Sequence, residues 1–431
     1  MKNTLCKIEN RPNSILLNSK GSVCAIGLVV GLLSCQNTQA QFVNKGKAKI
    51  SDETIVSLYM DYDNEVSGDF VNDGNLYVFR NFNNNGKVDY TKQKSGKTFF
   101  SGSQQQQISG SKIAVFQNVI FDNLDSLMPF DLKTVIEIGN NSDFQNGIIN
   151  AGAYDGEIIF DEQASQSNAG NQSFVDGMVQ KKGKEMFEFP VGNQLYYRPS
   201  IHAAGVKLEN TFTTQYFYQN SNSLYPHDQK EPVILSINDA EYWKVTQDAG
   251  NEKIVLSLTL NEKTTPSSFF NAEGKKVAIV RWDEVLNKWV SCKGELSDPA
   301  KTENYEKLLT AQVTGYGIFT MAIVKEDVVD EKLVVFNAIS PNDDGINDSF
   351  HIKGIDNYPD NQVEIYNRWG VKVFDTKSYN ESDNMFRGYS DGRATINRNE
   401  KLPTGTYFYI LKYNNTQKVV EQSGYLYINN Q

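Results

Sequence analysis

The sequence predicts an all-β protein of several domains, with a β-solenoid or sandwich first, then a central β-sandwich and a C-terminal seven-stranded β-sandwich. Short alternating or β-branched runs, such as residues 54–60 and 156–160, recur between Gly, Asn and Asp residues at intervals typical of β-solenoids and sandwiches. We find no long amphipathic helical pattern. The chain is 39% hydrophobic and 22% charged, which is typical of a folded protein.

Residues 1–40 have the features of a secretory leader. A basic, polar start precedes an apolar run at 23–33, which is shorter than the roughly 20 residues of a membrane span. We predict cleavage after Ala40, so that Gln41 becomes the first mature residue. The alternative is a lipoprotein signal ending at Cys35. No later segment reaches a run of about 18 apolar residues, so we expect no membrane span.

Charge and cysteine content restrict the classes of function. The formal net charge is -10, and removal of the leader, with four basic residues and one acidic residue, changes it to -13. This acidic balance argues against a nucleic-acid partner. Cleavage also removes three of the four Cys and leaves Cys292. A single Cys forms neither an intrachain disulfide nor a Cys-rich zinc site, so we expect an exported fold that depends on its core or on bound ions.

The segment 41–200 is rich in Asn, Gly, Gln and Ser, and its short strands are separated by turn signals. A flattened stack of strands that forms part of a β-solenoid is our first choice, and a sandwich is the second. We assign the acidic, Asn-rich stretch at 61–73 to solvated turns.

Several runs in this segment resemble runs that are common in large Bacteroidetes surface proteins. The resemblance implies a surface location and no particular chemistry. The runs are Phe100-Ser101-Gly102, Gln107-Ile108-Ser109-Gly110, Phe116-Gln117-Asn118-Val119, Phe174-Val175-Asp176-Gly177, Phe189-Pro190-Val191-Gly192 and Tyr197-Arg198-Pro199.

The segment 201–325 is predicted to be a β-sandwich-like domain. Apolar residues alternate at 254–260, as in a half-buried strand. We expect Trp243, Trp282 and Trp289 to form an aromatic core; the alternative is a platform on which sugars stack. The charged segment 326–332 is predicted to be a linker.

Residues 333–431 contain about seven regular, Tyr-rich strands, which favours a sandwich of about 100 residues. Gly370 is expected to turn a hairpin between strands at 362–368 and 371–376. Pro403 and Gly405 form a second turn, before a strand at 406–413. An exposed edge at 424–429 could accept a strand from a partner.

Four motifs in this segment resemble the gliding motility-associated C-terminal domain, which is the type B sorting domain of the Bacteroidetes type IX secretion system. They are Pro341-Asn342-Asp343-Asp344-Gly345-Ile346-Asn347-Asp348, Ile365-Tyr366-Asn367-Arg368-Trp369-Gly370, Leu402-Pro403-Thr404-Gly405-Thr406-Tyr407 and Gly424-Tyr425-Leu426-Tyr427-Ile428. The resemblance implies export across both membranes, with the type IX translocon and its outer-membrane shuttle or anchor proteins as partners. Two departures are Asp343, where the family has Gly, and Phe386-Arg387-Gly388, where it has W-D-G.

The opening motif also carries a candidate ion site. Asp343, Asp344, Asn347 and Asp348 bring several oxygen ligands into six residues, and Gly345 allows a tight bend. Calcium prefers six to eight oxygen ligands in loops of this kind, which makes it the candidate cofactor. The alternative is an Asx-rich turn that caps two strands.

No nucleophile elbow, HExxH, P-loop or Rossmann fingerprint is present, so we predict no enzyme activity. We interpret Cys292 as a buried core residue rather than a nucleophile. The leading hypothesis is a non-enzymatic surface protein that acts as an adhesin or as an accessory component of a gliding or adhesin complex. The alternative is a surface protein that binds or cleaves carbohydrate, with a surface glycan as its partner and paired carboxylates as the cleavage machinery.

Overall fold

A computed structural model describes residues 40–92, 95–270, 275–299, 302–325, 333–390, 401–415 and 419–430. Ala40–Gln431 forms one compact unit. These residues form strands and three short 3-10 turns, without an α-helix. In the same ranges, no helix has the length and apolar character that crossing a membrane requires. The predicted leader, apart from Ala40, and the predicted linker at 326–332 lie outside the described residues. The first strand begins at Gln41, the predicted mature start.

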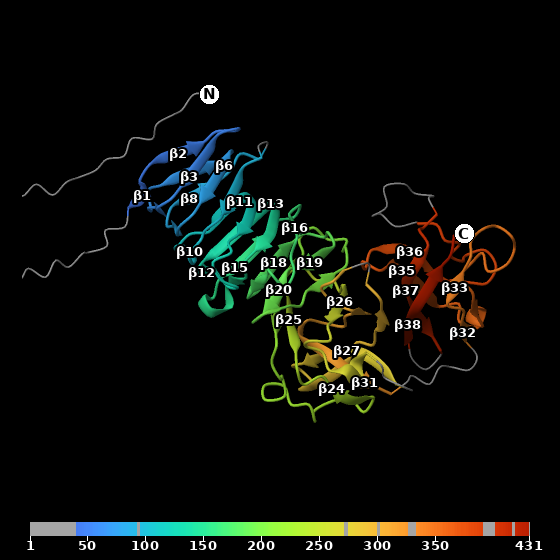
Figure 1. The fold of residues 1–431 in the computed structure, drawn as a ribbon. Helices are drawn as coiled ribbons and strands as arrows, with labels where there is room; N and C mark the ends of the chain where they lie inside the picture. The colour runs from blue at the N-terminus through green and yellow to red at the C-terminus, as the bar shows by residue number, and fades with distance from the viewer. Residues whose placement is uncertain are drawn as a thin grey trace, which may run out of the picture. The chain divides into compact units, whose positions relative to one another are not determined.

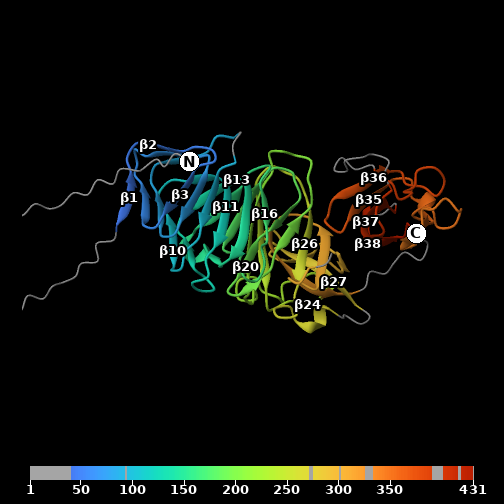
Figure 2. The ribbon, with the colours of Figure 1, turned by 45° about the horizontal axis from the view of Figure 1, so that its top comes forward.

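The N-terminal part is a β-solenoid with three stacks of parallel strands, and Figures 1 and 2 both show its strands side by side. The first stack is β1 (Gln41–Asn44), β4 (Asp61–Asn64), β7 (Phe82–Asn84), β10 (Gln106–Ser109), β12 (Phe130–Leu132), β14 (Ile149–Asn150), β17 (Val175–Asp176) and β20 (Val191–Asn193), followed by the antiparallel β21 (Tyr196–Tyr197). The second is β2 (Lys47–Ile50), β5 (Asp69–Asn72), β8 (Lys87–Asp89), the first half of β11 (Ala114–Asp122), the first half of β13 (Val135–Asn146), β15 (Glu157–Phe160) and β18 (Met178–Lys182). The third is β3 (Ile55–Leu58), β6 (Asn75–Val78), β9 (Lys97–Phe100), the second halves of β11 and β13, and β16 (Ser165–Ser167). The prediction of a solenoid is confirmed, with three faces in place of a flattened stack.

A ladder of buried Asn side chains connects the first coils. Asn44 donates from Nδ2 to Oδ1 of Asn64 at 2.8 Å, and Asn64 donates in the same way to Asn84 at 2.8 Å. These residues are 20 positions apart and lie opposite one another in the register of β1, β4 and β7. The assignment of 61–73 to solvated turns is therefore wrong, because this stretch forms β4 and β5, and both end on a buried Asn. The amides pair with each other, which removes the cost of their burial.

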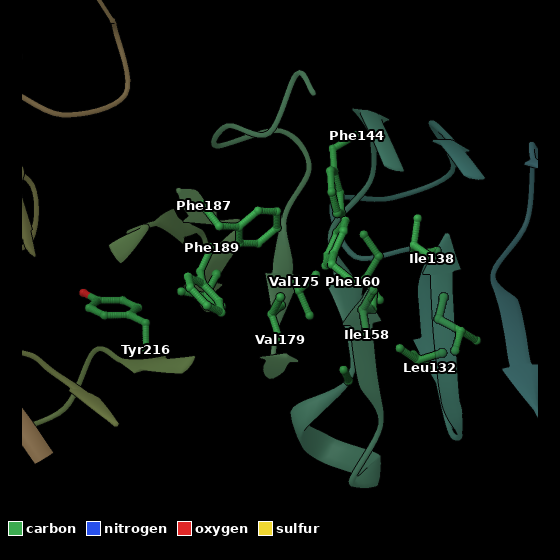
Figure 3. Packing of buried hydrophobic residues seen from close by; sticks show 14 of the residues in the cluster. Leu132, Ile138, Phe144, Ile158, Phe160, Val175, Val179, Phe187, Phe189 and Tyr216 are labelled. Carbon is green, nitrogen blue, oxygen red and sulfur yellow. The ribbon is translucent and has the colours of Figure 1, made fainter. Parts of the chain in front are cut away.

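The solenoid interior is filled with aliphatic and aromatic side chains, and this hydrophobic cluster continues beyond residue 200 into the central strands. Figure 3 shows Ile158, Phe160 and Val179 of the solenoid in the same cluster as Tyr216 of the central part. The chain pairing continues as well, because β18 is parallel to β15 but antiparallel to β23 (Thr211–Phe217). The solenoid and the central strands therefore share one core.

A buried ion pair lies where these two parts meet. Arg198 donates to Glu241 from Nε at 3.1 Å and from Nη2 at 3.2 Å, and both side chains are essentially inaccessible to solvent. Glu241 also accepts hydrogen bonds from the hydroxyls of Tyr216 and Thr265. The Trp243 indole donates to the Arg198 carbonyl at 3.0 Å. Arg198, which belongs to the Tyr197-Arg198-Pro199 run, thus connects the end of the solenoid to the central sheet through these hydrogen bonds.

The central part has two sheets whose inner side chains share a core, as expected for a sandwich. One contains β23, β24 (Ile234–Ile237), β25 (Tyr242–Ala249), β27 (Lys276–Asp283), β28 (Lys288–Ser291) and β31 (Gly317–Val324). The other contains β19 (Phe187–Phe189), β22 (Ser200–His202), β26 (Val255–Leu260), β29 (Glu295–Ser297) and β30 (Lys307–Gln312). Trp243, Trp282 and Trp289 are at most 5% exposed, so they are core residues and offer no platform for sugars.

The C-terminal part has its own hydrophobic core. Its main sheet has the order β33-β38-β37-β35-β36, and β32 pairs with β34 in a second small sheet. The bounds are β32 (Val334–Val335), β33 (Ala338–Ile339), β34 (Ile352–Lys353), β35 (Asn361–Asn367), β36 (Lys372–Lys377), β37 (Gly405–Asn414) and β38 (Val419–Ile428). The described strands number seven, as expected.

Candidate functional site: the C-terminal module and its opening loop

The opening motif folds into a loop that is held by its own carboxylates. Asp348 accepts the backbone N–H of Asp343 with one oxygen and that of Gly345 with the other, each at 2.7 Å. Asp344 accepts the N–H of Ile346 at 2.7 Å. Gly345 has a φ of 85°, a left-handed conformation that Gly adopts without strain. The departure at Asp343 is accommodated, although this residue also has a positive φ, of 65°.

Lys401 connects the opening loop to the turn that contains Pro403. Its ammonium donates to the carbonyl oxygen of Pro341 at 2.6 Å and lies 3.6 Å from a carboxylate oxygen of Asp343. The backbone N–H of Leu402, the next residue, donates to the carbonyl of Gly388 at 2.8 Å. Two motifs that are about 60 residues apart in the sequence are therefore neighbours in the fold.

The loop is also fixed to the core on its other side. Ser349 and His351 are 3.3 Å apart through Oγ and Nε2, and His351 Nδ1 lies 2.7 Å from a carboxylate oxygen of Glu381. Glu381 also accepts the backbone N–H of Ile352. Sequence reasoning missed this chain of contacts, because Glu381 lies outside the recognised motifs. Ser349 is buried, and Glu381 contacts both the His351 ring and the backbone of Ile352, so these contacts hold the end of the loop against β34.

Phe386 stands where the family has the Trp of its W-D-G motif, and its side chain lies in the core of the module. It is fully buried, its carbonyl accepts the N–H of Phe350 at 2.8 Å, and its ring lies 5.0 Å from that of Phe374. The module therefore keeps a buried aromatic side chain here.

The predicted hairpin at Gly370 is confirmed, and β35 pairs with β36 across it. Asn367 organises the turn, because its Oδ1 accepts the N–H groups of Trp369 and Val371, each at 2.9 Å. Trp369 is 37% exposed and lies beside the guanidinium of Arg368, 5.6 Å from the ring centroid. It does not share the buried face of Val363 and Ile365, since it lies in the turn rather than in the strand.

The remaining motif residues belong to the two longest strands of the sheet. Tyr407 is buried and donates its hydroxyl to the carbonyl of Pro403 at 2.9 Å. A Cβ at Gly424 would lie 2.5 Å from the Tyr409 hydroxyl oxygen and 2.6 Å from its ring, so only Gly allows these strands to pack as they do. Gly405 begins β37.

The edge expected to be open at 424–429 is partly covered. Ala338 and Ile339 of β33 pair with Tyr427 and Ile428 at this end of β38. Among the described residues, the earlier part of β38 pairs only with β37. The stretch that begins at Val419 is not entirely open either, because the ammonium of Lys293 donates to the backbone carbonyl of Glu421.

The four predicted calcium ligands lie in one loop, but hydrogen bonds or an ion pair already engage the carboxylates of three of them. Asp344 and Asp348 accept backbone N–H groups, and Asp343 faces Lys401. The residues that the structure describes contain no group of three or more His, Cys, Asp or Glu placed to hold a metal. Calcium binding stays a prediction. A chelator that leaves the melting temperature of the calcium-treated protein unchanged would contradict it.

Replacement of Asp348 should loosen the opening loop. Partial desolvation acts to raise the pKa of this carboxyl group, but backbone N–H groups of Gly345 and Asp343 hold the pKa below its ordinary value of 3.8. The stabilisation is present above this pH and is lost as the pH falls through the lowered pKa. We expect Asp348→Ala to reduce the melting temperature at pH 7 and to make its decline below about pH 4 shallower. Equal acid sensitivity in both proteins, measured by calorimetry, would contradict this role.

Residues that resemble enzyme machinery serve structural roles elsewhere. Burial raises the pKa of the Cys292 thiol, and the side chain is 4% exposed, so it is a poor nucleophile. Burial lowers the pKa of His202 to about 3, which keeps its ring neutral inside the core. His227 Nε2 lies 2.8 Å from the Ser221 hydroxyl in a loop, and no carboxylate of the described residues forms a hydrogen bond or ion pair with its ring.

The comparison with known families agrees with this geometry. A family model described as the CHU_C type IX secretion signal domain matches residues 333–428, from the start of the separate C-terminal core to the last residue of β38. No curated protein and no solved structure matches the chain. Residues 333–428 are therefore a type IX secretion signal domain, the C-terminal sorting domain of type B, which directs the chain out of the cell to its surface or to the medium.

Proposed function

We propose that this protein is a non-enzymatic surface protein that acts in adhesion, or as an accessory component of a gliding or adhesin complex. The observation that carries the proposal is the combination of a sorting domain with a long, rigid β scaffold that shares one continuous core. Such a scaffold presents side chains on fixed strands, and it orders little on binding.

The enzymatic alternative has weaker support in the described residues. Cys292 and His202 are buried, and the loop carboxylates at 343–348 are occupied by backbone groups or by Lys401. The aromatic platform that the carbohydrate alternative assigned to the central Trp residues is absent, because these rings form the core. Binding of a glycan elsewhere on the scaffold is a separate question, since it requires only a polar surface groove.

The proposal is tested by deleting the gene in the native host and measuring attachment and surface translocation. We expect reduced attachment to surfaces or reduced gliding, and recovery when the full chain is supplied again. Affinity purification of the protein from outer membranes should recover other surface components with it. Normal attachment and gliding together with turnover of a polysaccharide by the purified protein would overturn the proposal in favour of an enzyme.

A further inference from the structure

The second face of the solenoid continues into the central sheet through four adjacent strands, β15, β18, β23 and β25. Along them, Ile158, Val179, Thr214 and Val245 point inward and are fully buried; Figure 3 shows the first two in the core. Because side chains alternate along a strand, the neighbouring residues point outward. One outward row across the four strands consists of Glu157, Met178, Gln215 and Lys244.

This outward face is hollowed into a groove of about 340 Å³. The side chains of one wall are held in place by hydrogen bonds to each other. The Thr213 hydroxyl donates to Asp248, and the Gln180 amide donates to Thr213 at 3.2 Å and to Asp248 at 3.3 Å. Across three strand spacings, about 14 Å, the row begins with a carboxylate and ends with an ammonium group.

Three polar side chains of the groove have no hydrogen-bond or ion-pair partner in the part of the chain that the structure describes. They are the carboxylate of Glu157, the carboxamide of Gln215 and the ammonium of Lys244. Glu157 and Lys244 lie too far apart across the sheet to neutralise each other. The groove thus offers an acceptor at one end, a donor at the other, and a carboxamide with both functions between them.

The lining indicates the chemistry of the ligand. Sites for drug-like molecules are lined mainly by hydrophobic and aromatic residues, whereas Met178 is the one hydrophobic residue among the eight that line this groove, and the other seven carry polar or charged groups. Two carboxylates and one ammonium disfavour a polyanion. We propose that this groove binds an uncharged, hydroxyl-rich oligosaccharide, whose hydroxyls donate to Glu157 and accept from Lys244 while one sugar face rests on Met178. This inference rests on the proposed function as a surface binding protein and names its ligand class.

The surroundings of Glu157 make its replacement a clean test of the groove. Burial, with a further contribution from Asp248, raises the pKa of this carboxyl group above its ordinary 4.5. Desolvation disfavours the charged form of the carboxyl group. The folded protein therefore becomes more stable as the pH falls from neutral and this group takes up a proton. Glu157→Gln should therefore keep or raise the melting temperature, and a loss of binding cannot be attributed to unfolding.

The test measures binding of the purified, full-length exported chain to four immobilised neutral oligosaccharides: cellopentaose, laminaripentaose, mannopentaose and N-acetylated chitopentaose. We expect binding to at least one of them, and an affinity about tenfold lower for Glu157→Gln and for Lys244→Met, because each removes a hydrogen bond from a charged group. The matched control is Glu137→Gln, on the same face but outside the groove, where the carboxylate pairs with Lys182 at 3.0 Å.

Failure to bind all four oligosaccharides, equal affinity of Glu157→Gln and the unchanged protein, or stronger binding to a sulfated polysaccharide would each overturn the inference. The assay uses purified protein and does not depend on attachment of cells. If the protein mediates attachment but does not bind these glycans, the inference about the groove is rejected and the adhesion proposal stands. Conversely, if cells that lack the gene attach and glide normally, the adhesion proposal is rejected, and the groove is still tested by this assay.

Discussion

Deletion of residues 333–431 should leave the remainder of the protein in the periplasm. The sorting domain has its own hydrophobic core, so its removal takes away the export signal without opening the core shared by the solenoid and the central sheets. We expect surface signal to fall to the background of cells that lack the gene. The measurement is immunolabelling of intact cells, together with fractionation of periplasm and outer membrane.

The matching experiment transfers the domain. An inert reporter that carries the leader and residues 333–431 should reach the exterior, while the same reporter with the leader alone should stay in the periplasm. A further variant replaces Trp369, whose side chain is exposed. A change in export without a change in melting temperature would identify Trp369 as a recognition residue. Normal surface display of the truncated protein would refute the sorting role.

Removal of one partner of the buried pair between Arg198 and Glu241 should be among the most damaging point substitutions. Arg198→Ala leaves an inaccessible carboxylate whose remaining side-chain donors, two hydroxyls and the amide of Asn238, are all uncharged, and Glu241→Ala leaves an uncompensated guanidinium. Breaking a buried pair in this way typically costs about 3–5 kcal/mol. We expect the free energy of unfolding, measured with guanidinium chloride, to fall by this amount.

Two controls separate this effect from the loss of charge in general. Lys307→Ala removes a surface ion pair in which Lys307 Nζ lies 2.7 Å from a carboxylate oxygen of Asp298. This substitution should lower the free energy of unfolding by at most about 1 kcal/mol. The double variant Arg198→Met with Glu241→Leu replaces both charges by apolar groups of similar size, and it should recover much of the loss. A single variant as mild as Lys307→Ala would contradict the fastening role of the pair.

The C-terminal module is the part that the sequence predicts best, because its signals are local. The turn at Gly370 needs only a left-handed residue and the neighbouring Asn367, and the opening loop caps itself within nine residues. Motifs of this kind are recognisable without the tertiary structure. Even so, the pairing of β33 with β38 and the exposed position of Trp369 were not predicted, since edge pairing and the end of a strand depend on the whole sheet.

The rest of the site could not be predicted because its residues meet only after the strands pair. Arg198 and Glu241 are 43 positions apart, and the groove collects side chains from four strands between Glu157 and Asp248. The Asn ladder did leave a signal: Asn44, Asn64 and Asn84 recur every 20 residues. A polar stretch of this kind nevertheless predicts solvated turns, because alternation alone does not reveal that an amide is buried.

The repeated coil has a consequence for how such a protein can change over evolution. The first three coils pair through parallel strands and one amide contact per layer at a spacing of 20 residues, so gene duplication of such a unit would add a layer that makes the same bonds. Every added layer would carry the tip about 4.8 Å further from the junction, while the groove and the export tail keep their own surroundings. Lineages can thus adjust the reach of the molecule independently of its secretion and its ligand.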